Sequence, residues 1–311
     1  MQKKHYFFMF ILILTMSILS ACGSDVSSQS EASEEGENTQ SRETVTYESE
    51  TGPVEIPAEP KRIVALSNAP NVHALDGELV GVDKWTKGSP LLADELADVP
   101  VVSENEPETV MAQNPDLIIA GSTMENLDEL QKIAPTVIYT WGKLDYLEQQ
   151  VEIGKLLNKE EEAQEWVQEF KERTATLGEK IKEKYGEDVS VSVFEVDAKN
   201  FYVFGDAWAR GTEALYQAMD LNMSEKVQED ALEDGYHTLS LEVLPEYAGD
   251  FIVISKKASE ENEFMQSDTW NSIPAVKKGH VIEIDQDASS YSDPITLKYL
   301  VDTFEEGFLG E

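Results

Sequence analysis

The stretch "EEEAQEWVQEFKERTATLGEKIKEKYG", residues 160–186, decides the fold because it predicts one long helix in the middle of the chain. Apolar residues recur at steps of three, four or seven, with charged residues between them: Ala163, Trp166, Phe170, Leu177 and Ile181. Gly186 ends the pattern. At about 1.5 Å per residue, a helix of roughly 26 residues is a rod of about 39 Å. Such a rod predicts a rigid connection between two folded halves, with Trp166 in the core.

An internal repeat lies on the two sides of this helix. Residues 108–119, "ETVMAQNPDLII", and residues 242–253, "EVLPEYAGDFIV", each hold a Glu, an apolar residue two positions later, an Asp eight positions later and then a β-type apolar run. Each copy predicts a short helix, a turn and a strand, and a further strand is predicted before each, at residues 62–66 and 189–194. Alternating strands and helices predict an α/β protein with two Rossmann-like lobes and a ligand cleft between them.

The N-terminus has the pattern of a secretory signal. Lys3 and Lys4 precede an apolar run over residues 6–18, which is too short to span a bilayer as a resident helix. The only cysteine, Cys22, ends the sequence "LSAC", which resembles the lipobox of bacterial lipoproteins and implies lipidation of its sulfur. An ordinary signal peptide with a chance cysteine is the alternative. Two acyl chains would keep the protein on the membrane.

These patterns divide the chain into five predicted parts. They are a signal peptide at 1–21, a disordered tether rich in Ser, Glu, Gln and Thr at 22–46, an N-terminal α/β lobe at 47–158, the connecting helix at 159–186 and a C-terminal α/β lobe at 187–311.

Composition excludes some classes of function. The formal net charge is -37 and 41% of the residues are hydrophobic, which predicts a globular body with an acidic surface. Such a surface repels nucleic acids and anionic lipids, so no nucleic-acid partner is expected.

The folded part resembles the ferric-siderophore-binding lipoproteins that feed ABC importers, and within that family the ferric-hydroxamate binders. The resemblance runs from about Tyr47 to Phe308. It is carried by "IPAEPKRIVAL" (56–66), "NPDLIIAG" (114–121), "IAPTVIYTWGKLD" (133–145), "YVFGDAWARG" (202–211), "SLEVLPEYAGDFIV" (240–253), "WNSIPAVKKGHV" (270–281) and "SYSDPITL" (290–297). The combination of the W-x-R-G loop with the Tyr-Ser-Asp-Pro segment is the most specific part of this match.

The resemblance implies a ligand site. In hydroxamate binders the Trp that matches Trp208 contacts the siderophore and the Arg that matches Arg210 bonds the hydroxamate oxygens on iron. Tyr202 and Tyr291 are site candidates by the same match, although strand alternation could instead direct Tyr202 into the core. Contacts from the first lobe are expected among residues that follow its strands: Asn68, Asn71, Trp85 and Trp141.

The repeated glutamates have a different implied role. In the family, the residues that match Glu108 and Glu242 lie on the outer surface of each lobe and pair with arginines of the permease dimer. The alternative is that each is a helix N-terminal Glu favoured by the helix dipole.

Other functions fit the sequence less well. A zinc or manganese binder needs several histidine ligands, and His73, His237 and His280 make no pair at ligand spacing. A catecholate siderophore binder would need more cations than Arg210 alone, and a hydrolase would need a nucleophile motif such as G-x-S-x-G, which is missing. The sequence therefore predicts a non-catalytic, monomeric, membrane-anchored binding protein with no cofactor, in which the siderophore alone holds the iron. Its partners would be the ferric hydroxamate and an ABC permease dimer, with another ferric siderophore or a bare metal ion as the alternative ligand.

Overall fold

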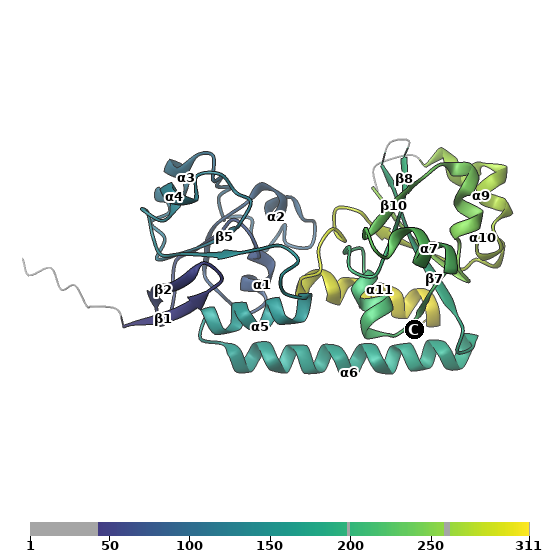
Figure 1. Ribbon diagram of the computed structural model, residues 1–311, viewed down its shortest axis with the longest axis horizontal. Helices are drawn as coiled ribbons and strands as arrows, with labels where there is room; N and C mark the ends of the chain where they lie inside the picture. The colour runs from purple at the N-terminus through teal and green to yellow at the C-terminus, as the bar shows by residue number, and fades with distance from the viewer. Residues whose placement is uncertain (1–42, 198–199, 258–261, 311) are drawn as a thin grey trace, which may run out of the picture. The chain divides into compact units, whose positions relative to one another are not determined.

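The computed structural model describes residues 43–197, 200–257 and 262–310 (Figure 1). The predicted signal peptide, Cys22 and nearly all of the predicted tether lie outside the described residues. Within the described ranges, no helix has the length and hydropathy needed to cross a bilayer.

The described chain begins with a hairpin of two antiparallel strands, β1 (Thr44–Ser49) and β2 (Gly52–Pro57). The predicted end of the tether at residue 46 is therefore wrong, because β1 already starts at Thr44. The run Thr-Val-Thr-Tyr has high strand propensity, and its register pairs Thr44 with Pro57 across the hairpin. The strand was not predicted because the run directly follows the polar residues of the tether.

The first lobe contains a four-stranded parallel sheet in the order β4-β3-β5-β6. Most residues of these strands are buried, as expected for a parallel sheet that helices cover. Its strands are β3 (Ile63–Ala65), β4 (Leu79–Val82), β5 (Leu117–Gly121) and β6 (Thr136–Tyr139), and its helices are α1 (Ala69–His73), α2 (Lys84–Gly88), α3 (Pro107–Met111), α4 (Leu127–Leu130) and α5 (Tyr146–Leu156).

The long helix α6 (Glu160–Tyr185) confirms the prediction made from its periodicity (Figure 1). Three glutamates lie in its first turn and two lysines in its last, an arrangement that the helix dipole favours. The helix packs on α5 of the first lobe and on η1 and α11 of the second. At Gly178 an added Cβ would lie 2.1 Å from the carbonyl oxygen of Met219, so α6 approaches the second lobe as closely as a backbone allows.

The second lobe is built on a mixed sheet in the order β10-β8-β7-β11-β12, with β9 beside β7. β7, β9, β11 and β12 are parallel, whereas β8 and β10 run antiparallel to their neighbours. Its strands are β7 (Ser190–Asp197), β8 (Asn200–Phe204), β9 (Asn222–Met223), β10 (Tyr236–Leu239), β11 (Phe251–Lys256) and β12 (Val281–Asp285). Its helices are η1 (Glu213–Ala218, π), α7 (Glu225–Ala231), η2 (Leu241–Val243, 3-10), α8 (Leu244–Tyr247), η3 (Glu263–Gln266, 3-10), α9 (Asp268–Ser272), α10 (Pro274–Lys278) and α11 (Pro294–Leu309).

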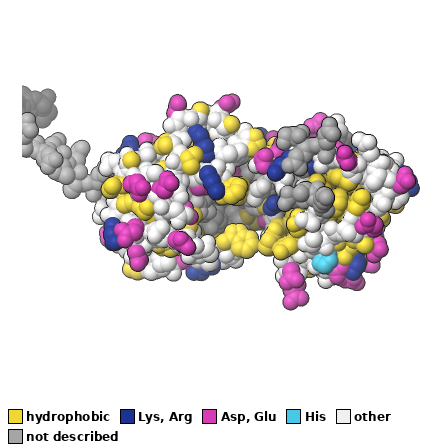
Figure 2. Space-filling model, turned by 90° about the horizontal axis from the view of Figure 1, so that it is seen from above, with side chains coloured by type: hydrophobic (Ala, Val, Ile, Leu, Met, Phe, Trp, Pro, Cys, Tyr) yellow, Lys and Arg dark blue, Asp and Glu magenta, His cyan; other side chains and the backbone are white. Residues whose placement is uncertain are grey.

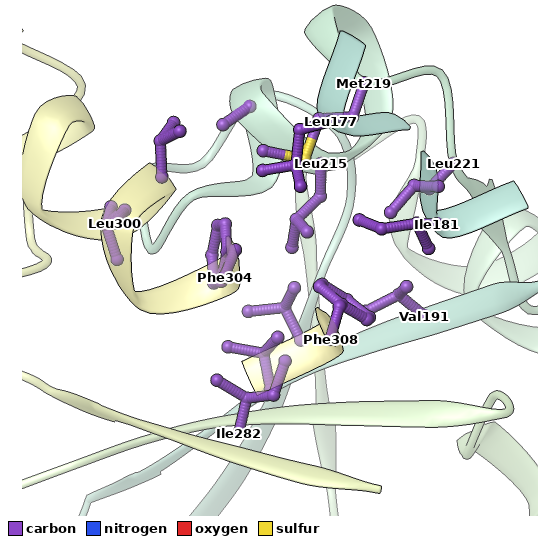
Figure 3. Packing of buried hydrophobic residues seen from close by; sticks show 14 of the residues in the cluster. Leu177, Ile181, Val191, Leu215, Met219, Leu221, Ile282, Leu300, Phe304 and Phe308 are labelled. Atoms are coloured by element: carbon purple, nitrogen blue, oxygen red, sulfur yellow. The ribbon is translucent and has the colours of Figure 1, made fainter. Parts of the chain in front are cut away.

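The largest core cluster joins α6 to this sheet. Leu177 and Ile181 of α6 meet Phe304 and Phe308 of α11 and Leu215 of η1 (Figure 3). Leu177 is 2% exposed and the other four are at most 1% exposed, so the helix that links the lobes is also part of the core of the second.

The internal repeat has the same structure in both lobes. Asp116 accepts hydrogen bonds from the backbone amides of Lys61 and Arg62 just before β3, and Asp250 accepts one from the amide of Ser190 at the start of β7. β5 then pairs with β3, and β11 with β7, in the parallel sense. The fold is therefore the predicted pair of α/β lobes joined by one long helix.

Candidate ligand-binding site

The W-x-R-G loop connects β8 to η1 and has an unusual backbone. Ala209, Arg210 and Gly211 have φ angles of 58°, 55° and 82°, so three successive residues are in the left-handed region. For Ala209 and Arg210 this conformation costs free energy, and such strain persists where surrounding contacts enforce it. At Gly211 a side chain is also excluded by space, since a Cβ would lie 2.5 Å from Cζ of Phe304.

Hydrogen bonds to the loop backbone hold this conformation. The amide of Arg210 donates to the carbonyl oxygen of Ser289 at 2.8 Å, the amide of Trp208 to Oγ1 of Thr212 at 2.9 Å, and the amide of Ala209 to Oε1 of Glu213 at 3.1 Å. Thr212 and Ser289 are fully buried. These buried partners hold the loop backbone in one conformation. That conformation determines where the Trp208 and Arg210 side chains lie.

Four aromatic side chains form a row that reaches from the first lobe into the second. We call Trp141, Trp208, Tyr236 and Tyr202 the aromatic row. The ring of Trp208 lies 5.5 Å from that of Trp141, edge to face, and 5.2 Å from that of Tyr236, which in turn lies 6.2 Å from Tyr202. Trp141 is 79% exposed and Tyr236 is 41% exposed. Figure 2 shows hydrophobic side chains gathered at a hollow between the lobes.

Arg210 has a carboxylate partner inside the second lobe. Its Nε and Nη2 donate to the two carboxylate oxygens of Glu195 at 2.8 and 3.0 Å, and Ser255 Oγ donates to the same carboxylate at 2.9 Å. Glu195 is 5% exposed, and the guanidinium lies 5.1 Å from the ring centre of Phe204. The bidentate pair fixes the plane of the guanidinium.

Tyr291 lies in the loop between β12 and α11, close to Arg210. Burial raises the pKa of the Tyr291 hydroxyl to about 12; the negative charges of Asp83 and Asp293 add to this shift and the positive charge of Arg210 opposes it. The hydroxyl therefore stays protonated at neutral pH and can donate a hydrogen bond. Asp293 caps α11 by accepting from the amides of Ile295 and Thr296.

A carboxylate from the N-terminal hairpin holds the turn that carries Trp141. Glu50 Oε2 accepts from the amide of Thr140 at 3.1 Å and lies 3.4 Å from Nζ of Lys143, so it contacts both residues that flank Trp141 and Gly142. Tyr47 of the same hairpin shares a hydrogen bond of 2.9 Å with Tyr139. The hairpin thus supports the first-lobe end of the aromatic row.

The remaining first-lobe candidates lie in three different environments. Trp85 is 67% exposed on α2, with Nζ of Lys84 4.7 Å from its ring centre. Asn68 precedes α1 with a φ of 57° and makes no side-chain cap, and its buried Nδ2 has no hydrogen-bond partner within the described ranges. Asn71 is 6% exposed and its Nδ2 donates to Oε1 of Gln150 at 2.9 Å, so this side chain has a partner inside the first lobe.

Glu108 and Glu242 occupy equivalent places in the two lobes. Both are exposed, Glu108 in the first turn of α3 and Glu242 in that of η2, and neither forms an ion pair with another described residue. A hydrogen bond from the Ser240 side chain holds the pKa of Glu242 below its usual value. Glu108 lies in the helix that directly precedes β5, and Glu242 lies in η2, which is followed by α8 and then by β11.

No group of three or more His, Cys, Asp or Glu side chains suited to a metal ion occurs in the part of the chain that the structure describes. Two of the three described histidines make ring contacts. His237 stacks on Tyr247, and His280 stacks on Phe251 with its ring centre 4.1 Å away.

Sequence reasoning missed Glu195, Tyr236 and Glu50. Glu195 interrupts the apolar run of β7, and a lone charge in a buried strand is a signal that it has a buried partner. Tyr236 follows Gly235, where an added Cβ would lie 2.4 Å from the Trp208 ring. A glycine at this position is therefore the sequence signal for the close contact between this segment and Trp208. Glu50 gave no signal in the sequence, because its role depends on the docking of the hairpin.

Comparison with known proteins gives consistent results. A family model described as periplasmic binding protein matches residues 64–288. The iron(3+)-hydroxamate-binding protein FhuD of Bacillus subtilis is 32% identical over 297 residues, covering 93% of each chain. The solved structure of FhuD2 from Staphylococcus aureus with bound ferrioxamine B superposes with a TM-score of 0.76 at 33% identity, over 81% of this chain and 99% of that one. A Bacillus subtilis protein of the FhuD fold family, described as the periplasmic binding component of a ferrichrome ABC transporter, has a TM-score of 0.77 at 31% identity, over 84% and 99%.

The family whose model matches consists of solute-binding proteins and not of enzymes, and the architecture of two lobes joined by one helix agrees with it. The chain belongs to the periplasmic binding protein family.

Proposed function

We propose that this protein captures ferric hydroxamate siderophores outside the cytoplasm and delivers them to an ABC importer. One observation carries the proposal: the aromatic row lies beside the W-x-R-G loop, whose strained backbone and bidentate ion pair hold Trp208 and Arg210 in fixed positions. Its relatives are named for the same class of ligand.

The chemistry of the site suits such a ligand. A ferric trihydroxamate has oxygens around the metal and aliphatic chains outside them. Arg210 and the Tyr291 hydroxyl can donate hydrogen bonds to the oxygens, and the indoles of Trp208 and Trp141 can cover the aliphatic part. Iron stays on the siderophore, so the protein needs no metal ligands of its own.

Titration tests this function directly. Ferric siderophores absorb where tryptophan emits, so ferrioxamine B and ferrichrome should quench the intrinsic fluorescence to saturation with micromolar or tighter dissociation constants. Zinc should give no saturable response. Failure of every ferric hydroxamate to bind the folded protein would overturn the proposal, and binding of ferric citrate alone would favour the other siderophore class.

Delivery requires a surface that the importer recognises. We assign this role to Glu108 and Glu242, because equal charges at equivalent places of two similar lobes fit a two-fold permease dimer. The binding protein is expected to act as a monomer.

Anchoring through Cys22 is a further part of the proposal. Replacing Cys22 by Ala should abolish palmitate labelling and leave the protein unprocessed or released into the medium, because the thiol is the site of diacylglycerol attachment. The measurement is detergent partitioning together with metabolic labelling. Unchanged labelling in the variant would show that the chain is not a lipoprotein of this kind.

A further inference from the structure

The charge of Arg210 is balanced inside the protein. Glu195 accepts from Nε and Nη2 of Arg210 with both carboxylate oxygens, at 2.8 and 3.0 Å, and is itself oriented by Ser255. The Arg210 side chain is 18% exposed and that of Glu195 is 7% exposed. The guanidinium is therefore partly exposed and directly paired with a buried negative charge.

Glu195 is not required there by packing. Its neighbours in β7, Phe194 and Val196, are buried apolar residues, and an ion pair in such a place adds little to stability compared with apolar side chains of the same volume. The pair leaves Nη1 of Arg210 with only a long contact of 3.4 Å to the carbonyl oxygen of Trp208. Arg210 thus keeps hydrogen-bond donors for a ligand while its net charge is cancelled.

Two acidic groups and Arg210 act on the Tyr291 hydroxyl. The acidic groups are Asp83 from the first lobe and Asp293 from the second. With Glu195 paired to Arg210, the charges that remain around Tyr291 are negative. A site of this kind repels an anionic complex and accepts a neutral or cationic one.

We propose that Glu195 is a specificity-determining residue, which cancels the charge of Arg210 and so restricts the site to ferric hydroxamates of zero or positive charge. This inference rests on the proposed function and names the ligand class more narrowly. Arg210 then recognises the oxygens around iron by hydrogen-bond geometry, and Glu195 excludes anionic ferric complexes such as tris-catecholates.

A charge series on one hydroxamate scaffold tests the proposal. Ferrioxamine B carries one positive charge, its N-acetyl derivative is neutral and its N-succinyl derivative carries one negative charge, while the ferric hydroxamate part is the same in all three. A trianionic ferric tris-catecholate extends the series. Dissociation constants are measured by calorimetry for the wild type and for Glu195→Gln, which keeps the size and part of the hydrogen bonding of the side chain.

The wild type should bind the cation and the neutral derivative more tightly than the anion. In Glu195→Gln the ratio of anion to cation affinity should rise on the order of tenfold, since one unit charge is uncovered within a few ångströms of the ligand. Combining Glu195→Gln with Arg210→Gln restores neutrality, so the double variant should return to the wild-type ratio although it binds every ligand more weakly. Glu305→Gln removes a carboxylate from the Arg173 pair on α6 and should leave the ratio unchanged.

Equal changes in affinity for all members of the series in Glu195→Gln would show that Glu195 only supports Arg210, and would overturn the proposal. If Glu195→Gln fails to fold, Arg210→Gln and the double variant still test the proposal. Arg210→Gln leaves the charge of Glu195 unpaired, so its ratio of anion to cation affinity should fall below that of the neutral double variant. Equal affinity ratios in these two variants would refute the charge argument. Absence of binding of every ferrioxamine by the wild type would instead refute the proposed function itself.

Discussion

Replacing Trp208 by Ala is expected to weaken ferric hydroxamate binding by ~1 to 3 kcal/mol, roughly five- to 150-fold. Trp208 is the central member of the aromatic row, in contact with Trp141 on one side and Tyr236 on the other. Its removal takes away the flat wall and also the neighbour that orders the exposed Trp141 ring. Calorimetry is the suitable measurement, because the substitution removes a fluorophore.

Trp208→Phe is the matched control, since it keeps an aromatic ring against Gly235 and Tyr236. It should retain most of the affinity that the alanine variant loses. Equal thermal stability of both variants would show that the loss comes from ligand contact. Wild-type affinity in a folded Trp208→Ala protein would remove this residue from the site.

The double substitution Glu108→Ala with Glu242→Ala should abolish most siderophore uptake and leave siderophore affinity at the wild-type value. Both carboxylates are exposed and lie in equivalent first turns before β5 and β11, one in each lobe. Truncating one partner of a charge pair that becomes buried costs about 2 to 5 kcal/mol, so losing both should reduce uptake more than either single change. Iron-55 uptake by cells and titration of the purified protein give the two readouts.

Glu95→Ala with Glu225→Ala provides the control for charge, because these residues are also exposed and also lie one in each lobe. That pair of changes should leave uptake intact. A loss of affinity in the Glu108 and Glu242 variants would assign these residues to the cleft, and normal uptake in the double variant would end the docking assignment.

The elements that could be predicted from sequence are those whose signal is local. The period of apolar residues in α6 is visible within its own 26 residues, and the aspartates of the repeat, Asp116 and Asp250, each bond the backbone just before or at the start of a neighbouring strand. The start of β1 at Thr44 was missed, because a hairpin strand beside a polar stretch resembles that stretch until its partner strand is known.

The site residues also divide into those with a local sequence signal and those without one. Trp208 and Arg210 were predicted as site residues from a short motif, whereas the partner of Arg210 lies 15 residues away in β7 and that of Asn71 lies 79 residues away in α5. Both partnerships depend on packing of separate elements, which no local pattern encodes. The same applies to Tyr236, which reaches Trp208 only because β10 pairs with β8.

The N-terminal hairpin has a practical meaning for anyone who prepares a secreted, anchor-free version of this protein. Glu50 braces the turn on which Trp141 stands, and Tyr47 ties the hairpin to Tyr139 at the end of β6. A version that starts after Pro57 would contain the strands of the two lobe sheets and α6, but it would lack Tyr47, Glu50 and the buried side chain of Ile56. We expect this shortened protein to bind the siderophore more weakly because the turn that carries Trp141 has lost its support. An expressed version should therefore begin before Thr44, where β1 starts.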